Sequence, residues 1–286
     1  IAYGLGNPEV DVWDLFTGKA SPKACYPLGS VLTIAAAGSE MSNSCVITNE
    51  EGWYKKALDT DLARPKFAIM NPEITYTLPD YQTQCGCADI MMHTMERYFV
   101  LEDTMEITDK IAQDVMKNVM KYAKILKKDP ENYEARAEIM WCGSLSHNGL
   151  TGCGTCGGDW ATHLIEHELG GMFDVAHGAG LAAVWGSWAR YVMDEKPERF
   201  AQFAVDVMGV EESDDVKSTA LKGVEAVEEF YRMIEMPTNM KELGIDPTDE
   251  QIKDMAMKAT NHDTQQLGAF KKLSAKDLVE IYKTAK

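Results

Sequence analysis

The placement of histidine constrains this chain more than any other feature of its sequence. Five of the six histidines lie between positions 93 and 177 of the 286 residues. Asp89 precedes His93 by four positions, and His163 precedes His167 by the same spacing. Side chains four residues apart share one face of a helix, where they can hold one ion together. The chain is therefore expected to fold so that two helical regions present carboxylate and imidazole groups to each other.

The residues around Asp89 indicate that this carboxylate is buried. Ile90, Met91 and Met92 follow it in an apolar helical run. An isolated charge in such a core is very costly, so Asp89 needs a partner. A hydrogen-bonded pair of Asp89 and His93 with a purely structural role is one interpretation of this segment.

A second histidine cluster favours a metal site over that structural interpretation. His163 and His167 lie in a predicted helix that follows a glycine-dense loop, with Asp159 as the expected N-cap, and His177 comes soon after. Together with the first pair, these residues give more imidazole and carboxylate than a protein core usually hides. Such ligands suit iron(II), zinc, nickel or manganese, and no thiolate is required.

The segment 163–167 also matches a different metal pattern. It reads His-Leu-Ile-Glu-His and fits the H-x-x-E-H motif of inverted zinc proteases, in which both histidines bind zinc and Glu166 is the general base. So short a motif arises easily in a histidine-rich helix, and it leaves Asp89 and His93 without a role. A zinc hydrolase and a metal-binding fragment without catalytic activity stay open as alternative functions.

The seven cysteines indicate a reducing compartment. Their number is odd, the chain is long and no signal peptide opens it, so we expect a cytoplasmic protein. Cys85 and Cys87 form a C-x-C, and Cys153 and Cys156 form a C-x-x-C. A zinc site built from these four would have an uncommon ligand spacing. Close packing of small residues is the preferred interpretation.

The charge and the hydropathy exclude two kinds of partner. The chain carries 28 basic and 45 acidic side chains, which gives a formal charge of −17. Such a surface repels phosphate backbones and anionic lipids, so neither nucleic acid nor a membrane is an expected partner. No apolar run reaches the length of a transmembrane helix.

The first 79 residues alternate short β-prone runs with turns. The runs cover residues 31–35, 45–48 and 66–70. Asn49-Glu50-Glu51-Gly52 follows the second run and is a hairpin-like turn signal. The pattern predicts an α/β domain over residues 1–79.

Beyond residue 79 the patterns are helical. A row of apolar residues recurs every four positions, the spacing of a helix with one buried stripe. The row consists of Ile107, Ile111, Val115 and Val119. Thr248 with Gln251, and Ser274 with Asp277, have the spacing of capping boxes at the start of later helices. These patterns predict an all-helical domain over residues 80–286.

Several segments, in the same order along nearly the whole chain, carry a resemblance to a known family. The most specific are Asp-Ile-Met-Met-His-Thr-Met-Glu at 89–96 and the segment 159–169, which contains His163 and His167. The others cover residues 27–33, 38–41, 46–51, 64–69, 77–79 and 270–274. On these segments the chain resembles the iron-dependent alcohol dehydrogenase family, most closely its butanol dehydrogenase-like branch.

The resemblance implies a fold, a reaction and cofactors. The fold is a dinucleotide-binding α/β domain followed by an all-helical metal-binding domain, similar to dehydroquinate synthase. The reaction is reversible hydride transfer between a primary alcohol or aldehyde and NAD or NADP. Fe²⁺, with Zn²⁺ as the alternative, is expected to act as a Lewis acid on the substrate oxygen. The resemblance also implies a homodimer.

Roles for individual residues follow from the same resemblance. The family's metal ligands correspond to Asp89, His93, His163 and His177. His167 corresponds to a catalytic histidine beside the nicotinamide and not to a ligand. Thr33, Ser39 and Lys55 correspond to positions that bind the cofactor.

Two features depart from the family's pattern. Ala37 stands where the family often has a threonine that helps to bind the cofactor. The chain opens with Ile1-Ala2, which corresponds to the end of the helix that follows the family's glycine-rich phosphate loop. We therefore expect an N-terminally truncated chain with a partial dinucleotide-binding domain.

Overall fold

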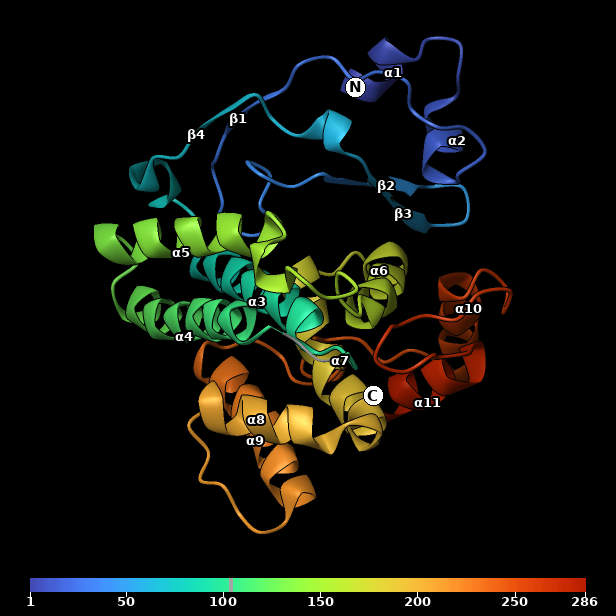
Figure 1. Ribbon diagram of the computed structural model, residues 1–286. Helices are drawn as coiled ribbons and strands as arrows, with labels where there is room; N and C mark the ends of the chain where they lie inside the picture. Colours follow the sequence, from blue (N-terminus) through green and yellow to red (C-terminus); the bar gives the residue numbers. More distant parts are fainter. Residues whose placement is uncertain (103–104) are drawn as a thin grey trace.

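Turns break the first part of the chain into short elements, whereas long helices build the rest (Figure 1). The computed structural model describes residues 1–102 and 105–286. The N-terminal part forms the upper layer in Figure 1, above the helical body. Its helices and strands are α1 (Ala2–Gly6), α2 (Val12–Phe16), β1 (Gly29–Val31), β2 (Ser44–Asn49), β3 (Tyr54–Asp59) and β4 (Phe67–Ile69).

The strands of this upper layer pair in two separate sheets. β2 and β3 form an antiparallel hairpin in which Asn49 lies opposite Tyr54. The predicted turn at 49–52 is confirmed, and Gly52 supplies the positive φ of 87° that the tight connection requires. β1 and β4 pair in parallel, with Gly29 opposite Phe67.

The predicted β-run over residues 31–35 is wrong beyond its first residue, because β1 ends at Val31. The following loop lies directly on helix α3, where a Cβ atom built on Gly86 would be 2.2 Å from the carbonyl oxygen of Ala35. Only glycine permits so close an approach of two backbones. The segment Cys85-Gly86-Cys87 therefore serves the close packing of this loop on the helix.

Helix α3 lies at the centre of the helical body, where α4, α5 and α7 all pack against it. The long elements are α3 (Asp80–Tyr98), α4 (Glu106–Lys128), α5 (Tyr133–His147), α6 (Ala161–Phe173), α7 (His177–Val192), α8 (Pro197–Asp206), α9 (Val216–Met233), α10 (Asp249–Ala259) and α11 (Ala275–Ala285). The predicted capping boxes at Thr248 and Ser274 are confirmed at the starts of α10 and α11. None of the helices in the described ranges is long and apolar enough to cross a bilayer.

Helix α4 confirms the predicted helix but not the whole of its predicted stripe. Val115 and Val119 are buried, whereas Ile107 is 63% exposed. A row with a spacing of four residues overshoots one helical turn by roughly 40° at each step, so it drifts away from the core. The buried face instead uses intervals of three and four residues. It includes Ala112, Val115, Met116, Val119, Ala123 and Leu126.

Aromatic side chains fill the centre of the helical body. Trp185 and Trp188 are each 1% exposed. The rings of Phe99 and Phe200 stack with their centroids 4.3 Å apart. The N-terminal part has a smaller cluster of its own, made of Tyr3, Leu15, Phe16 and Ala63. The helical body therefore holds most of the apolar core and supplies a rigid base for side chains at its upper edge.

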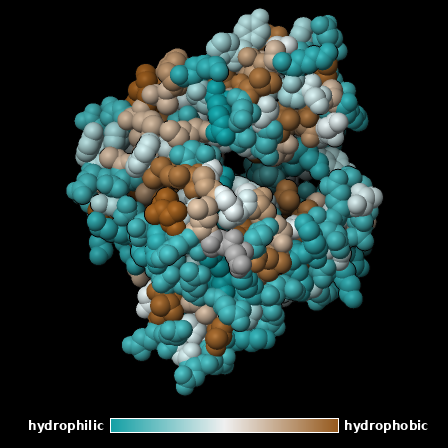
Figure 2. Space-filling model, in the orientation of Figure 1, coloured by the Kyte–Doolittle hydropathy of each residue, from teal (hydrophilic) through white to brown (hydrophobic). Residues whose placement is uncertain are grey.

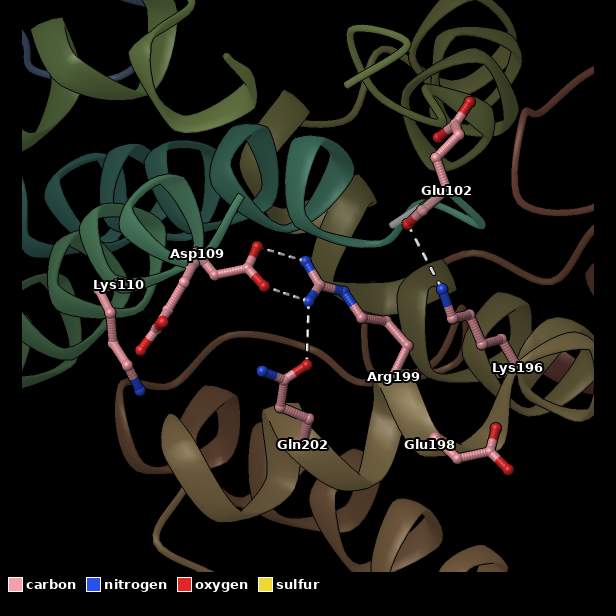
Figure 3. Close-up of a pocket in the computed structure, with 8 residues that line it drawn as sticks. Glu102, Asp109, Lys110, Lys196, Glu198, Arg199 and Gln202 are labelled. Atoms are coloured by element: carbon pink, nitrogen blue, oxygen red, sulfur yellow. Dashed lines mark hydrogen bonds and ion pairs between the residues drawn. The ribbon is translucent and has the colours of Figure 1, made fainter. Parts of the chain in front are cut away.

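A buried ion pair fixes α8 against α4 at the edge of a surface pocket (Figure 3). Nη1 and Nη2 of Arg199 donate to the two carboxylate oxygens of Asp109 at 2.6 and 2.7 Å. Nε of the same guanidinium donates to the carbonyl oxygen of Tyr98 at 3.0 Å. A bidentate pair of this kind fixes orientation as well as distance. It therefore anchors the C-terminal end of α3 within the body.

Candidate metal centre

Three helices bring the four predicted metal ligands together. Asp89 and His93 lie one turn apart on α3, His163 lies in the first turn of α6, and His177 is the first residue of α7. Helix α3 is buried on nearly all its faces around these positions, and Asp89 is 2% exposed. The carboxylate is therefore held in a low-dielectric environment that demands compensating partners.

The start of α6 differs from the prediction that made Asp159 its N-cap. Trp160 occupies the N-cap position with a left-handed φ of 64°. Asp159 still accepts a hydrogen bond from the backbone N–H of Ala161, at 3.1 Å. Its other oxygen accepts from the N–H groups of Ala269 and Phe270, both at 2.6 Å. Asp159 thus fixes the start of α6 against a loop near the C-terminus, and with it the position of His163.

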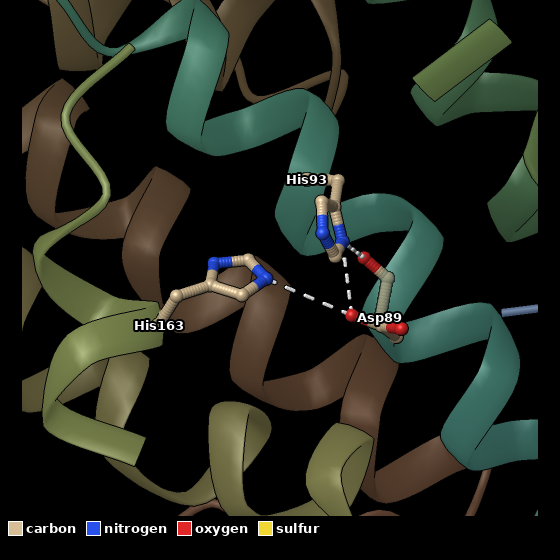
Figure 4. Close-up of side chains that lie close together, drawn as sticks. All are labelled: Asp89, His93 and His163. Atoms are coloured by element: carbon tan, nitrogen blue, oxygen red, sulfur yellow. Dashed lines mark hydrogen bonds and ion pairs between the residues drawn. The ribbon is translucent and has the colours of Figure 1, made fainter. Parts of the chain in front are cut away.

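The three imidazole rings converge on one carboxylate oxygen. Oδ1 of Asp89 lies 2.9 Å from Nδ1 of His93 and 3.7 Å from Nε2 of His163. Figure 4 shows these three side chains reaching toward one another from α3 and α6. Nε2 of His177 lies 3.6 Å from the same oxygen. One carboxylate and three imidazoles make a ligand set that suits a divalent first-row metal ion.

An unpaired buried nitrogen indicates that the cluster is built for a cation. Nε2 of His163 is buried and has no hydrogen-bond partner within the described ranges. Leaving such a group unsatisfied costs about 1–3 kcal/mol. A metal ion between His163 and Asp89 would satisfy this nitrogen and the carboxylate together. The residues present therefore fit the metal.

Electrostatics in the cluster keep the carboxylate charged. Burial alone would raise the pKa of Asp89, but the three neighbouring imidazoles hold it well below its ordinary value. Burial alone would lower the pKa of His163, but the neighbouring carboxylates of Asp89 and Glu96 raise it to about 9. Burial lowers the pKa of His93 to about 4. The site therefore favours a proton on His163, and a bound metal ion would take the place of this proton.

Two buried glutamates stand behind the imidazoles. Oε1 of Glu96 lies 3.1 Å from Nδ1 of His163 and accepts the backbone N–H of the same residue at 3.0 Å. Oε2 of Glu166 contacts Nδ1 of His177. A carboxylate bound to the far nitrogen of an imidazole fixes its tautomer and leaves the other nitrogen free for a metal ion. Each glutamate therefore leaves available to a cation the Nε2 of its histidine, which faces Asp89.

Sequence reasoning missed Glu96, although a signal was present. Glu96 follows Asp89 by seven residues and His93 by three, so all three lie on one face of α3. Sequence reasoning assigned Glu166 only as the general base of a hydrolase. The structure gives it a different neighbour, His177, which lies on another helix.

The two histidines of the segment 163–167 belong to different clusters. Potential ligand atoms of His163 group with Asp89 and His93, whereas those of His167 group with Glu166 and His177. The rings of His167 and His177 have centroids 5.8 Å apart. Burial lowers the pKa of His167 to about 3, so its imidazole is neutral. This arrangement does not support the paired zinc ligands that the protease motif requires.

A cavity of about 1110 Å³ lies between the N-terminal part and the metal centre. Figure 2 shows the surface hollowed where these two parts meet. All four histidines named so far line the cavity, and Ser39 and Lys55 line it from the N-terminal part. Thr33 is exposed and lies outside this lining. The structure thus brings two of the three predicted cofactor-binding residues toward the metal centre.

His147, at the end of α5, is a further histidine in the cavity wall. Its ring centroid lies 3.7 Å from that of His93, and burial holds the pKa of His147 well below its ordinary value. No spacing in the sequence connects it with the other histidines, because it comes from a separate helix.

Comparisons with known proteins agree along the whole length of the chain. The model of the iron-containing alcohol dehydrogenases matches residues 1–72, and the model of the C-terminal part of the Fe-containing alcohol dehydrogenase family matches residues 83–286. NADH-dependent butanol dehydrogenase A of Clostridium acetobutylicum is 34% identical over 274 residues, which cover 96% of this chain and 70% of that protein. The NADPH-dependent aldehyde reductase YqhD of Escherichia coli is 32% identical and is covered to 73%, with 100% of this chain aligned.

A solved structure gives the same result. The crystal structure of NADH-dependent butanol dehydrogenase A from Thermotoga maritima superimposes with a TM-score of 0.93 at 35% identity, covering 99% of this chain and 72% of that one. The fold, the metal centre and these relatives define a metal-dependent oxidoreductase linked to NAD(P). The chain belongs to the iron-containing alcohol dehydrogenase family.

The comparisons confirm the predicted family, the fold class and the NAD(P)-linked dehydrogenase function with iron as the family's metal. They support this function over a zinc hydrolase. The chain spans about 70% of the length of the curated relatives named above.

Proposed function

We propose that this chain interconverts small primary alcohols and aldehydes with NAD(H) or NADP(H). The ligands of its Fe²⁺ are Asp89, His93, His163 and His177. The observation that carries the proposal is the convergence of three imidazole nitrogens within 3.7 Å of one buried carboxylate oxygen. The printed names of the relatives, two butanol dehydrogenases and an aldehyde reductase, support this substrate class.

Each group in the cavity has a separate task in this proposal. The metal, when bound, supplies a Lewis acid for the substrate oxygen, and the nicotinamide ring accepts or donates the hydride. His167 is neutral and lies at the cavity wall, where it orients the nicotinamide or passes a proton. Thr33, Ser39 and Lys55 contribute to cofactor binding.

The proposal extends to organisation and assembly. Residues 1–79 are part of a dinucleotide-binding domain, and residues 80–286 form the metal-binding catalytic domain. The strands lie between residues 29 and 69 and the long helices begin at Asp80, which supports this division. We also propose that the protein is a homodimer in the reducing cytoplasm. Its seven cysteines are all free in the structure, which is consistent with that compartment.

Anaerobic loading with Fe²⁺ provides the test of the proposed function. The loaded chain is expected to consume NADH or NADPH when butanal is added, and a chelator is expected to stop the reaction. Absorbance of the reduced nicotinamide at its characteristic wavelength measures the rate. Peptide hydrolysis without consumption of the cofactor would instead identify a hydrolase. Metal binding without any change in NADH or NADPH fluorescence would identify a non-catalytic fragment.

A further inference from the structure

Lys55 reaches from the N-terminal part of the molecule to a buried carboxylate behind the metal centre. It lies on β3, and its Nζ is 3.6 Å from Oε2 of Glu166 on α6. The side chain of Glu166 is 0% exposed and that of Lys55 is 18% exposed. The same Oε2 contacts Nδ1 of His177. The three side chains therefore form a continuous chain of contacts from strand to metal ligand.

Glycines leave the space that this chain of contacts occupies. A Cβ atom built on Gly170 would lie 2.8 Å from Nζ of Lys55 and 3.0 Å from Oε1 of Glu166. One built on Gly180 would lie 2.8 Å from Cγ of Glu166. Side chains at these two positions would displace the carboxylate or the ammonium group. The helices α6 and α7 are thus shaped around the ion pair.

The hairpin that carries Lys55 is itself docked on α6 and α10. A Cβ atom built on Gly171 would lie 2.8 Å from the carbonyl oxygen of Trp53, so the turn of the hairpin approaches the helix as closely as glycine allows. Nζ of Lys258 on α10 donates to the carbonyl oxygen of Gly52 at 3.0 Å. These contacts hold β3 in a defined position and therefore fix the backbone of Lys55, from which its side chain extends.

The fully buried carboxylate of Glu166 depends on the ammonium group of Lys55 to keep its position. Isolated buried charge is costly, and removing one member of a buried pair leaves the other uncompensated. Without Lys55, the Glu166 carboxylate is expected to move toward water or toward other donors. Its contact with Nδ1 of His177 would then be weakened, and the imidazole would lose the partner that fixes its tautomer.

We infer that Lys55 is a positioning residue for the metal centre, which acts through Glu166 on His177. This inference rests on the proposed function, because it takes His177 as a metal ligand. It gives Lys55 a second task beside cofactor binding. It also means that the position of the β2–β3 hairpin affects how firmly the helical domain holds its metal ion.

Metal affinity measured without any cofactor separates the two tasks of Lys55. We expect the Lys55→Met variant to bind Zn²⁺ or Co²⁺ about 10-fold more weakly than the wild type in chelator competition, the low end of the effect of losing an outer-shell partner. Lys55→Arg, which keeps the charge, is expected to restore most of the affinity. Lys56→Met is the matched control, because neighbouring residues of a strand point to opposite faces. It makes the same change of charge and should leave the affinity unchanged.

A double-mutant cycle tests whether Lys55 acts through Glu166. Glu166→Gln keeps an oxygen that can accept from His177 but removes the charge that Lys55 compensates. If the inference is correct, adding Lys55→Met to Glu166→Gln weakens metal binding little further. Independent, multiplying effects would overturn it, as would Lys55→Met with wild-type affinity. If His177→Ala also binds the metal like the wild type, the proposed ligand set is wrong, which is a distinct failure.

Discussion

The His163→Ala variant is expected to fold and to lose its metal ion. His163 connects the two halves of the site, because its Nε2 faces Asp89 while its Nδ1 is held by Glu96. Loss of an outer-shell partner alone costs roughly 10–100-fold in metal affinity, and loss of a ligand is expected to exceed that. Aldehyde-dependent oxidation of NADH or NADPH should fall with the metal content. Anaerobic loading, desalting and metal analysis measure the effect directly, and His177→Ala is expected to behave in the same way.

His167→Ala is the control for this experiment, since it removes a neighbouring histidine from the same helix. We expect it to keep the metal ion and to lose turnover, because His167 lines the cavity but is not one of the imidazoles that surround Oδ1 of Asp89. His177 differs from it in this respect, since its Nε2 lies 3.6 Å from that oxygen. The reverse pattern, in which His167→Ala loses the metal and His177→Ala keeps it, would favour the ligands of the protease motif. Retention of the metal by the His163→Ala variant would contradict both interpretations.

Local features of the sequence predicted local features of the structure. The spacing of Asp89 and His93 placed both on one helical face, and the capping boxes at Thr248 and Ser274 marked the starts of α10 and α11. The turn at 49–52 gave the β2–β3 hairpin. Each of these depends on contacts between residues a few positions apart, whose geometry is set by the regular backbone.

The residues that contact the predicted metal ligands from other helices and strands could not be predicted in this way. Glu166 and His177 are 11 residues apart, but their contact crosses from α6 to the start of α7. Lys55 reaches Glu166 from a strand more than 100 positions earlier in the chain. The periodicity of a sequence does not predict such contacts, because they depend on how whole helices and strands pack. The glycines that permit this packing could not be recognised from the sequence either, since a glycine there does not show which atoms lie against it.

Gly178 illustrates how packing sets the metal site, and its replacement is the second change with a large expected effect. A Cβ atom built on Gly178 would lie 2.0 Å from the carbonyl oxygen of Cys85, which is backbone and cannot move aside as a side chain could. In the Gly178→Ala variant, the start of α7 must therefore move away from α3. His177 is the adjacent residue, so its Nε2 would move away from Asp89.

We expect Gly178→Ala to lower the free energy of unfolding by about 1–3 kcal/mol, the usual cost of overpacking a core. A displacement of about 1 Å at a catalytic centre can cost roughly 100-fold in rate, so kcat should fall on that scale.

Gly143→Ala on α5 is the matched control. Gly143 is also a buried helical glycine, but the nearest contact of a Cβ atom built on it would be Cδ1 of Ile90 at an ordinary 3.4 Å. That variant should be as stable as the wild type or more so, since alanine is favoured over glycine in helices by about 0.5–1 kcal/mol. Thermal unfolding and metal content, measured on both variants, check the pair. Equal metal content and equal stability in the two would show that α7 can be displaced from α3 without disturbing His177, and the close approach at Gly178 would then have no role in holding the site together.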